Sequence, residues 1–128
     1  NAGSRPDAAR QDYDAAYAQV VRNDLKGAER LFKAYLEEHP DTPLVPNAWY
    51  WLGQVQFRGG QFEEARVSFL NAAQFKDSQK RPDALYKLGL ISLKQGDRDK
   101  ARRYFEVVQK TYPEDTAAKL ARKELERL

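Results

Sequence analysis

The 128-residue chain contains no cysteine and no methionine, and it has a single histidine, His39. A disulfide, a thiolate zinc site, an iron–sulfur cluster and a cysteine nucleophile are therefore excluded. The chain also lacks any run of 18 consecutive apolar residues, so the sequence predicts no transmembrane helix and no apolar signal-peptide core. Its length favours a single domain.

A large excess of one charge is absent as well, because 22 Lys and Arg side chains are matched by 19 Asp and Glu side chains. Residues 61–128 carry most of the positive surplus, with 15 basic and 11 acidic side chains. The densest basic stretch holds Arg98, Lys100, Arg102 and Arg103, interleaved with acidic residues and without the aromatic side chains of nucleic-acid-binding surfaces. We therefore expect neither nucleic acid nor an anionic membrane as a partner.

Strand patterns are scarce, whereas apolar residues recur at steps of three and four among residues that favour helices. Proline and glycine fall mostly between these periodic segments. The sequence therefore predicts seven helices, at residues 8–22, 25–38, 46–58, 61–75, 82–95, 97–111 and 115–127. Residues 1–7 show no packing pattern and are expected to form a disordered leader or linker.

An alanine and a phenylalanine four residues apart recur three times, at intervals of 37 and 36 residues. The three copies are Ala28-x-x-x-Phe32, Ala65-x-x-x-Phe69 and Ala101-x-x-x-Phe105. Upstream of the second and third copies stand Trp49-x-x-Leu52-Gly53 and Leu85-x-x-Leu88-Gly89, and Pro40 and Pro113 follow the first and third copies. These residues match the pattern of the tetratricopeptide repeat (TPR), in which small residues let two antiparallel helices approach closely.

The repeats predict an all-α TPR solenoid of three helix-turn-helix units plus a C-terminal capping helix. The TPR domain would span residues 8–128, with repeats at about 9–42, 46–79 and 82–115 and the capping helix at 115–128. The first repeat is degenerate, because it lacks the Trp, Leu and Gly of the pattern, as terminal repeats often do. Three repeats are enough for a stable stack.

In such an array the first helices of the repeats line a groove in which peptides dock. Projecting these helices predicts an inner face rich in aromatic and basic side chains, which suit a protein partner. Its candidate residues are Tyr13, Tyr17, Val20, Asn47, Tyr50, Trp51, Gln54, Arg58, Asp83, Tyr86, Lys87, Leu90 and Lys94. Packing between helices is the alternative role for some of these aromatic residues, and Trp49 is expected to pack there. The basic members favour a partner segment that carries acidic groups.

Residues suited to catalysis are few. His39 is expected to be a partly exposed residue at a helix C-terminus, where its positive form interacts favourably with the helix dipole. One histidine without a second ligand at helical spacing makes a poor metal site. No serine lies in a Gly-x-Ser-x-Gly turn and no phosphate-binding glycine loop is present. We therefore expect no enzyme activity, no cofactor and no metal site.

The stretch from Pro40 to Gln54, PDTPLVPNAWYWLGQ, is more specific than a generic repeat. It resembles a junction in the C-terminal TPR domain of the periplasmic Tol–Pal accessory proteins, the YbgF/CpoB family. Further matches are Ala84-Leu85-Tyr86-Lys87-Leu88-Gly89, Tyr112-Pro113 and Ala117-Ala118. The resemblance covers about residues 9–128.

The resemblance implies a non-enzymatic periplasmic adaptor that binds TolA of the Tol–Pal system. Such an adaptor coordinates septal peptidoglycan synthesis by a penicillin-binding protein with outer-membrane constriction during division. It also implies a signal peptide already removed and an N-terminal coiled coil, missing here, that makes the full-length protein trimeric. The domain alone is then expected to be monomeric. Two alternatives stay open: a self-assembling structural TPR module, and another periplasmic TPR scaffold such as an outer-membrane assembly lipoprotein.

Overall fold

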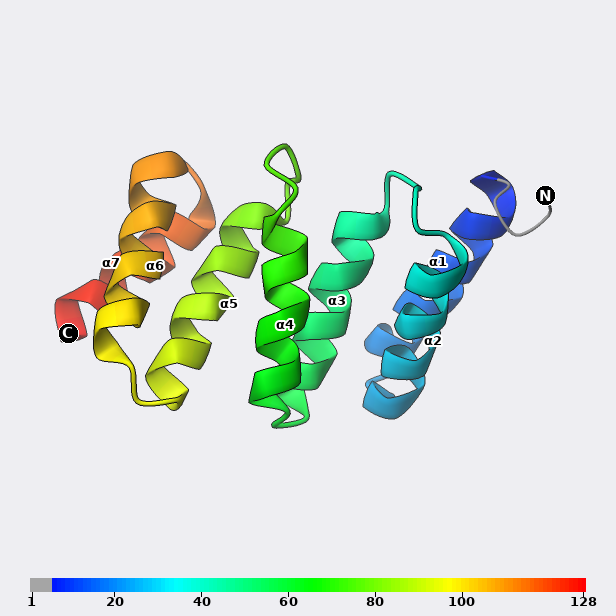
Figure 1. Ribbon diagram of the computed structural model, residues 1–128, viewed down its shortest axis with the longest axis horizontal. Helices are drawn as coiled ribbons and strands as arrows, with labels where there is room; N and C mark the ends of the chain where they lie inside the picture. Colours follow the sequence, from blue (N-terminus) through cyan, green and yellow to red (C-terminus); the bar gives the residue numbers. More distant parts are fainter. Residues whose placement is uncertain (1–5) are drawn as a thin grey trace.

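The computed structural model describes residues 6–128 and forms only α-helices and connecting turns within that range. The helices are α1 (Pro6–Val21), α2 (Leu25–Glu38), α3 (Val45–Arg58), α4 (Phe62–Ala73), α5 (Arg81–Lys94), α6 (Arg98–Thr111) and α7 (Thr116–Arg127). They stand in a row in sequence order, each packed against the next (Figure 1). The prediction of an all-α solenoid built from three helix pairs and a seventh helix is confirmed.

The helix ends differ from the predicted ends by at most two residues. The first helix begins at Pro6 rather than residue 8, since a proline, which has no N–H to leave unpaired, suits the first turn of a helix. The predicted leader therefore loses residues 6 and 7 to α1, and residues 1–5 lie outside the described part of the chain. Helix α4 ends at Ala73, whose carbonyl accepts a hydrogen bond from Arg81 Nε at 2.7 Å.

The turn inside each helix pair is the same in all three repeats. Asn23, Gly60 and Gly96 lie one repeat apart and have φ angles of 61°, 79° and 82°, a left-handed conformation that Gly and Asn tolerate best. The next residue in the first and third repeats is an aspartate, Asp24 or Asp97. Its carboxylate accepts a backbone hydrogen bond of 3.0 Å from the first turn of α2 or α6, which caps that helix.

The helices of a pair touch through the small residues that the repeat pattern predicts. A Cβ atom on Gly53 would lie 2.9 Å from the Phe69 ring, and one on Gly89 would lie 2.4 Å from Cε1 of Phe105. The repeat alanines and phenylalanines are fully buried. The predicted close packing is confirmed, and glycine is required where the Phe69 and Phe105 rings lie against the facing helix, whereas the first repeat has Ala16 at this position.

Helix α7 packs against α5 and α6 and covers the end of the third repeat. It does so through Ala117, Ala118 and Ala121, which are buried, whereas Leu120 of the same helix is 37% exposed. No helix within residues 6–128 combines the length and the apolar composition needed to cross a membrane.

Candidate functional site

The row of helices has two broad faces. The first helices of the pairs, α1, α3 and α5, together with α7, form one face, which we call the first-helix face. The second helices, α2, α4 and α6, form the opposite face, the second-helix face, which is turned toward the viewer in Figure 1. The residues predicted to line a peptide groove belong to the first helices α1, α3 and α5.

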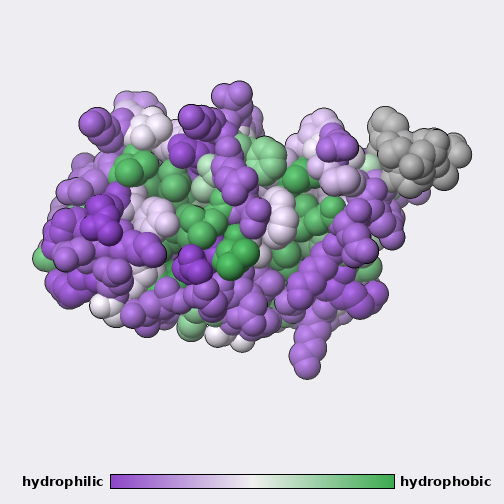
Figure 2. All heavy atoms as spheres, in the orientation of Figure 1, coloured by the Kyte–Doolittle hydropathy of each residue, from purple (hydrophilic) through white to green (hydrophobic). Residues whose placement is uncertain are grey.

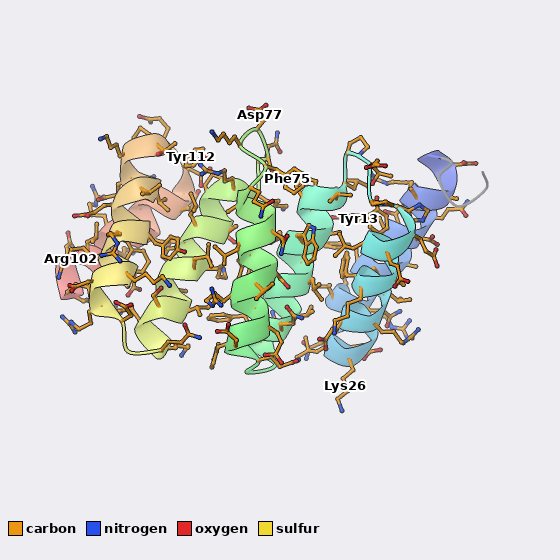
Figure 3. The ribbon with its side chains drawn as sticks, viewed as in Figure 1. Tyr13, Lys26, Phe75, Asp77, Arg102 and Tyr112 are labelled. Atoms are coloured by element: carbon orange, nitrogen blue, oxygen red, sulfur yellow. The ribbon has the colours of Figure 1, made fainter. Side chains whose placement is uncertain are left out.

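Three predicted groove residues, Tyr13, Tyr50 and Tyr86, occupy the same position in successive repeats. They are only 8%, 7% and 8% exposed, so most of each ring packs between helices rather than lining a groove. Figure 3 shows Tyr13 at the junction between the first and second helix pairs. The hydroxyl of Tyr50 donates a hydrogen bond to the Asp83 carboxylate in α5. Each ring packs against the repeat phenylalanine of its own helix pair, and Tyr50 in addition links α3 to α5.

Burial raises the pKa of all three tyrosines, because a phenolate loses its hydration inside the protein. For Tyr50 the nearby charge of Asp83 raises the pKa further, and the hydrogen bond to that carboxylate requires the phenol proton. For Tyr86 the charges of Glu124 in α7 and of Asp83 raise the pKa further. We call these three tyrosines the tyrosine ladder.

The accessible part of the first-helix face centres on Trp51, which is half-buried. Its ring makes an edge-to-face contact with Tyr17 of α1, with centroids 5.2 Å apart, and Tyr17 is 39% exposed. On the other side, the Lys80 ammonium lies 5.1 Å from the centre of the Trp51 ring, a cation–π contact. The structure brings the predicted groove residues Tyr17 and Trp51 into contact and adds Lys80, which the sequence projection missed because it precedes α5.

The remaining predicted groove residues divide by exposure. Asn47, Gln54, Lys87 and Leu90 are half-buried, and Arg58 and Lys94 are exposed. The Lys87 ammonium is 3.4 Å from the Asp83 carboxylate, whereas Arg58 and Lys94 form no ion pair with another described residue. Val20 is wrong as a groove residue, because it is buried in the core of the first repeat.

His39 is also placed differently from the prediction, because it is 1% exposed rather than partly exposed. Its Nε2 atom lies 2.7 Å from the Asp12 carboxylate of α1, and its ring packs against Tyr35. Potential ligand atoms of Asp12, Glu38 and His39 lie within 4.8 Å of one another. Because Asp12 and His39 already bond to each other, we interpret the group as a link between α1 and the end of α2.

Replacing Asp12 with alanine is expected to lower the free energy of unfolding by about 1–3 kcal/mol, because it leaves the buried His39 Nε2 atom unpaired. Urea unfolding followed by circular dichroism measures the change. Asp14→Ala is the matched control, since Asp14 is in the same helix and pairs with Arg10 at the surface, where such pairs contribute about 0–1 kcal/mol. Equal losses from the two variants would contradict the link.

Residues 13–84 and 83–115 each match the sequence model of the tetratricopeptide repeat. The chain belongs to the tetratricopeptide repeat family. Domains of this family are protein-binding modules, so a protein partner fits the aromatic first-helix face better than a small-molecule substrate does.

Two solved structures share the fold of this TPR chain. The N-terminal domain of stress-induced protein-1 from C. elegans aligns with 94% of this chain and 95% of that domain, at 22% identity and a TM-score of 0.76. The type III secretion translocator chaperone SycD of Yersinia enterocolitica aligns with 97% of this chain and 92% of that protein, at 18% identity and a TM-score of 0.81. At these identities the likeness shows the fold alone.

A curated relative of this TPR chain is the cell division coordinator CpoB of Pseudomonas putida. The two are 35% identical over 51 residues, which is 40% of this chain and 19% of the relative. The match thus spans about a fifth of the length of that protein.

Proposed function

We propose that this TPR domain is a non-enzymatic adaptor that binds a segment of a partner protein on its first-helix face. The observation that carries the proposal is the accessible aromatic pair of Tyr17 and Trp51, flanked by Lys80. Partly exposed tryptophan and tyrosine side chains give large contact areas with few rotatable bonds, and they dominate the energy of many protein interfaces.

Charge on the same face favours a segment that carries acidic residues. Arg58 and Lys94 occupy the same position in successive repeats, are exposed, and pair with no carboxylate among the described residues. An acidic segment crossing from α3 to α5 would meet both cations. Their interaction with it would weaken as salt is added, because exposed charges are screened.

The similarity to CpoB supports a finer proposal about the partner and the compartment. We infer that the domain works in the periplasm, where it binds TolA and, through a complex with a penicillin-binding protein, coordinates peptidoglycan synthesis with outer-membrane constriction. In this proposal the isolated domain is a monomer, and a coiled coil in the full-length protein supplies the trimer.

Titration of a TolA fragment tests the site, with the two tryptophans of the chain as a matched pair. Trp51 contacts Tyr17 on the first-helix face, whereas Trp49 lines a hollow on the second-helix face. Trp51→Ala is expected to weaken binding about 30-fold, as loss of a central aromatic residue does, and Trp49→Ala by less than about threefold. Isothermal titration calorimetry gives the affinities, and circular dichroism confirms that each variant is folded.

The outcomes separate the parts of the proposal. If Trp51→Ala binds as tightly as the parent domain, the first-helix site is contradicted. If the parent domain does not bind the fragment, TolA is the wrong partner. The competing function, self-assembly through the aromatic face, predicts a mass that rises with concentration in sedimentation equilibrium, whereas we expect the monomer mass throughout.

A further inference from the structure

A hollow of about 390 Å³ opens on the second-helix face, away from the proposed peptide site. It lies between α2 and α4 above α3, and its apolar walls are formed by Leu36, Trp49, Leu52 and Val67. Figure 2 shows hydrophobic residues at the surface of this part of the face, surrounded by hydrophilic ones. The Val67 side chain is 45% exposed. The volume of the hollow lies in the range, roughly 300–1,000 Å³, of pockets that bind ligands.

The equivalent junction between α4 and α6 has a smaller hollow, of about 200 Å³, which is lined by Lys100, Arg103, Tyr104 and Val107. At that junction Leu85 takes the place of Trp49 and is only 6% exposed. Tyr104 stands one repeat after Ser68, and Leu70 stands one repeat after Lys33. Two large side chains thus occupy positions at which the first junction has a serine and a lysine.

The polar groups in the floor of the hollow already have partners. Ser68 Oγ donates a hydrogen bond of 2.6 Å to Gln56 Oε1, and Gln56 Nε2 donates one of 3.3 Å to the Glu29 carboxylate. An entering side chain therefore meets apolar walls and no unsatisfied donor or acceptor from these residues. The interior suits an aliphatic or aromatic side chain rather than a polar one.

The rim of the hollow is acidic. Glu63 and Glu64 stand on the α4 side. Hydrogen bonds from Arg66 and Gln95 hold the pKa of Glu63 at about 2, so Glu63 is ionised at neutral pH, and its charge is paired with that of Arg66. Glu64 forms no ion pair with any described residue, and the single rim cation, Lys33, is 3.1 Å from Glu29. One repeat later, lysine replaces Glu64 and arginine replaces Val67. Asp99 keeps an acid at the position of Glu63, so the unpaired acidic charge of Glu64 is what distinguishes the rim of the first junction.

We propose that this hollow is a second docking site, which takes a bulky apolar side chain from a basic segment of a partner protein. The apolar side chain would fill the space between Trp49 and Val67, and flanking lysines or arginines would face Glu63 and Glu64. This site is independent of the first-helix face, so one domain can hold two partners on opposite sides. A bound segment would bury Val67, an apolar residue that the fold leaves exposed.

Two synthetic amphipathic helical peptides test the proposal. They share one stripe of leucines, and the flanking residues are lysines in the first peptide and glutamates in the second. Each is titrated into the ¹⁵N-labelled domain, and the side-chain N–H signals of Trp49 and Trp51 are followed by NMR. The lysine peptide is expected to shift the Trp49 signal and to bind at least tenfold more tightly than the glutamate peptide.

Two variants sharpen the test. Val67→Arg introduces the residue found at the equivalent position of α6 and is expected to weaken binding of the lysine peptide at least tenfold. The matched control is Val107→Arg, which changes an exposed valine of α6 that does not line the hollow between α2 and α4 and is expected to leave binding unchanged. Glu64→Lys alters an exposed rim residue, keeps the hollow, and is expected to reverse the preference toward the glutamate peptide.

The proposal is overturned if the lysine peptide leaves the Trp49 signal unmoved at millimolar concentration, or moves only that of Trp51. Equal affinity for the two peptides, or unchanged affinity in Val67→Arg, overturns it as well. Trp51→Ala is expected to bind the lysine peptide as the parent domain does, so failure of the first-helix proposal and failure of this one are distinguishable.

Discussion

Replacing Phe105 with alanine is expected to lower the free energy of unfolding by about 3–5 kcal/mol, the usual cost of truncating a buried phenylalanine. The ring has no exposed surface and lies against Gly89 of the facing helix. Without the ring, the two helices of the third repeat enclose a cavity that the surrounding alanines are too short to fill. Urea unfolding followed by circular dichroism gives the change.

A control and a second substitution separate packing between the helices from general loss of apolar surface. Phe75→Ala, in the loop that leaves α4 (Figure 3), removes the same group from a 38% exposed position and is expected to cost less than about 1 kcal/mol. Gly89→Ala is expected to destabilise the parent domain, because the new Cβ would lie 2.4 Å from the Phe105 ring.

In the Phe105→Ala background the same Gly89→Ala change is expected to stabilise the domain by up to about 1 kcal/mol, since alanine favours the helix more than glycine does. A double-mutant cycle therefore yields a large coupling between the two positions. Additive effects would contradict the requirement for glycine opposite Phe105.

Much of this fold could be predicted from the sequence because the residues that pack the two helices of a pair recur along the chain. The spacing of alanine, phenylalanine and glycine identifies which residues contact each other across a helix pair. The intra-pair turn follows from Asn23, Gly60 and Gly96, whose residue types tolerate a positive φ. The helix ends were predicted less well, because each depends on residues that do not recur. Pro6 begins α1, and Arg81 bonds to the carbonyl of Ala73, at which α4 ends.

The candidate site was harder to predict, because a helical projection gives the direction of a side chain but not the distance to the next helix. Tyr13, Tyr50 and Tyr86 were expected to line the groove, yet each ring is buried against the repeat phenylalanine of the second helix of its own pair. Their exact repeat spacing was the missed signal, since residues that recur at one position usually serve the stacking of repeats. His39 was misplaced for a related reason, because its partner, Asp12, is 27 residues away in sequence.

The tyrosine ladder predicts a steep loss of stability above pH 10. Below pH 10 both the folded and the unfolded chain keep the phenol proton of Tyr50. Above pH 10 an unfolded chain releases this proton, whereas burial and the charge of Asp83 raise the pKa in the folded chain. The folded state then holds more protons, so the free energy of unfolding falls as pH rises.

The slope from one fully retained proton is about 1.4 kcal/mol per pH unit, and the loss between pH 10 and pH 12 is about 2 kcal/mol, because the unfolded tyrosine is only half ionised at pH 10. Tyr50→Phe is expected to remove this contribution to the pH dependence. Tyr13→Phe and Tyr86→Phe are expected to flatten the slope less, because only Tyr50 has a hydrogen-bonded carboxylate, that of Asp83, in addition to burial. Urea unfolding at several pH values gives the slope of the free energy of unfolding against pH for each variant. Loss of the Tyr50 hydrogen bond lowers stability at every pH, so it does not change this slope. If the free energy of unfolding had the same pH dependence in the parent domain and in Tyr50→Phe, Tyr50 would ionise equally in the folded and the unfolded chain. The link between α3 and α5 through Tyr50 and Asp83 would then not depend on the phenol proton.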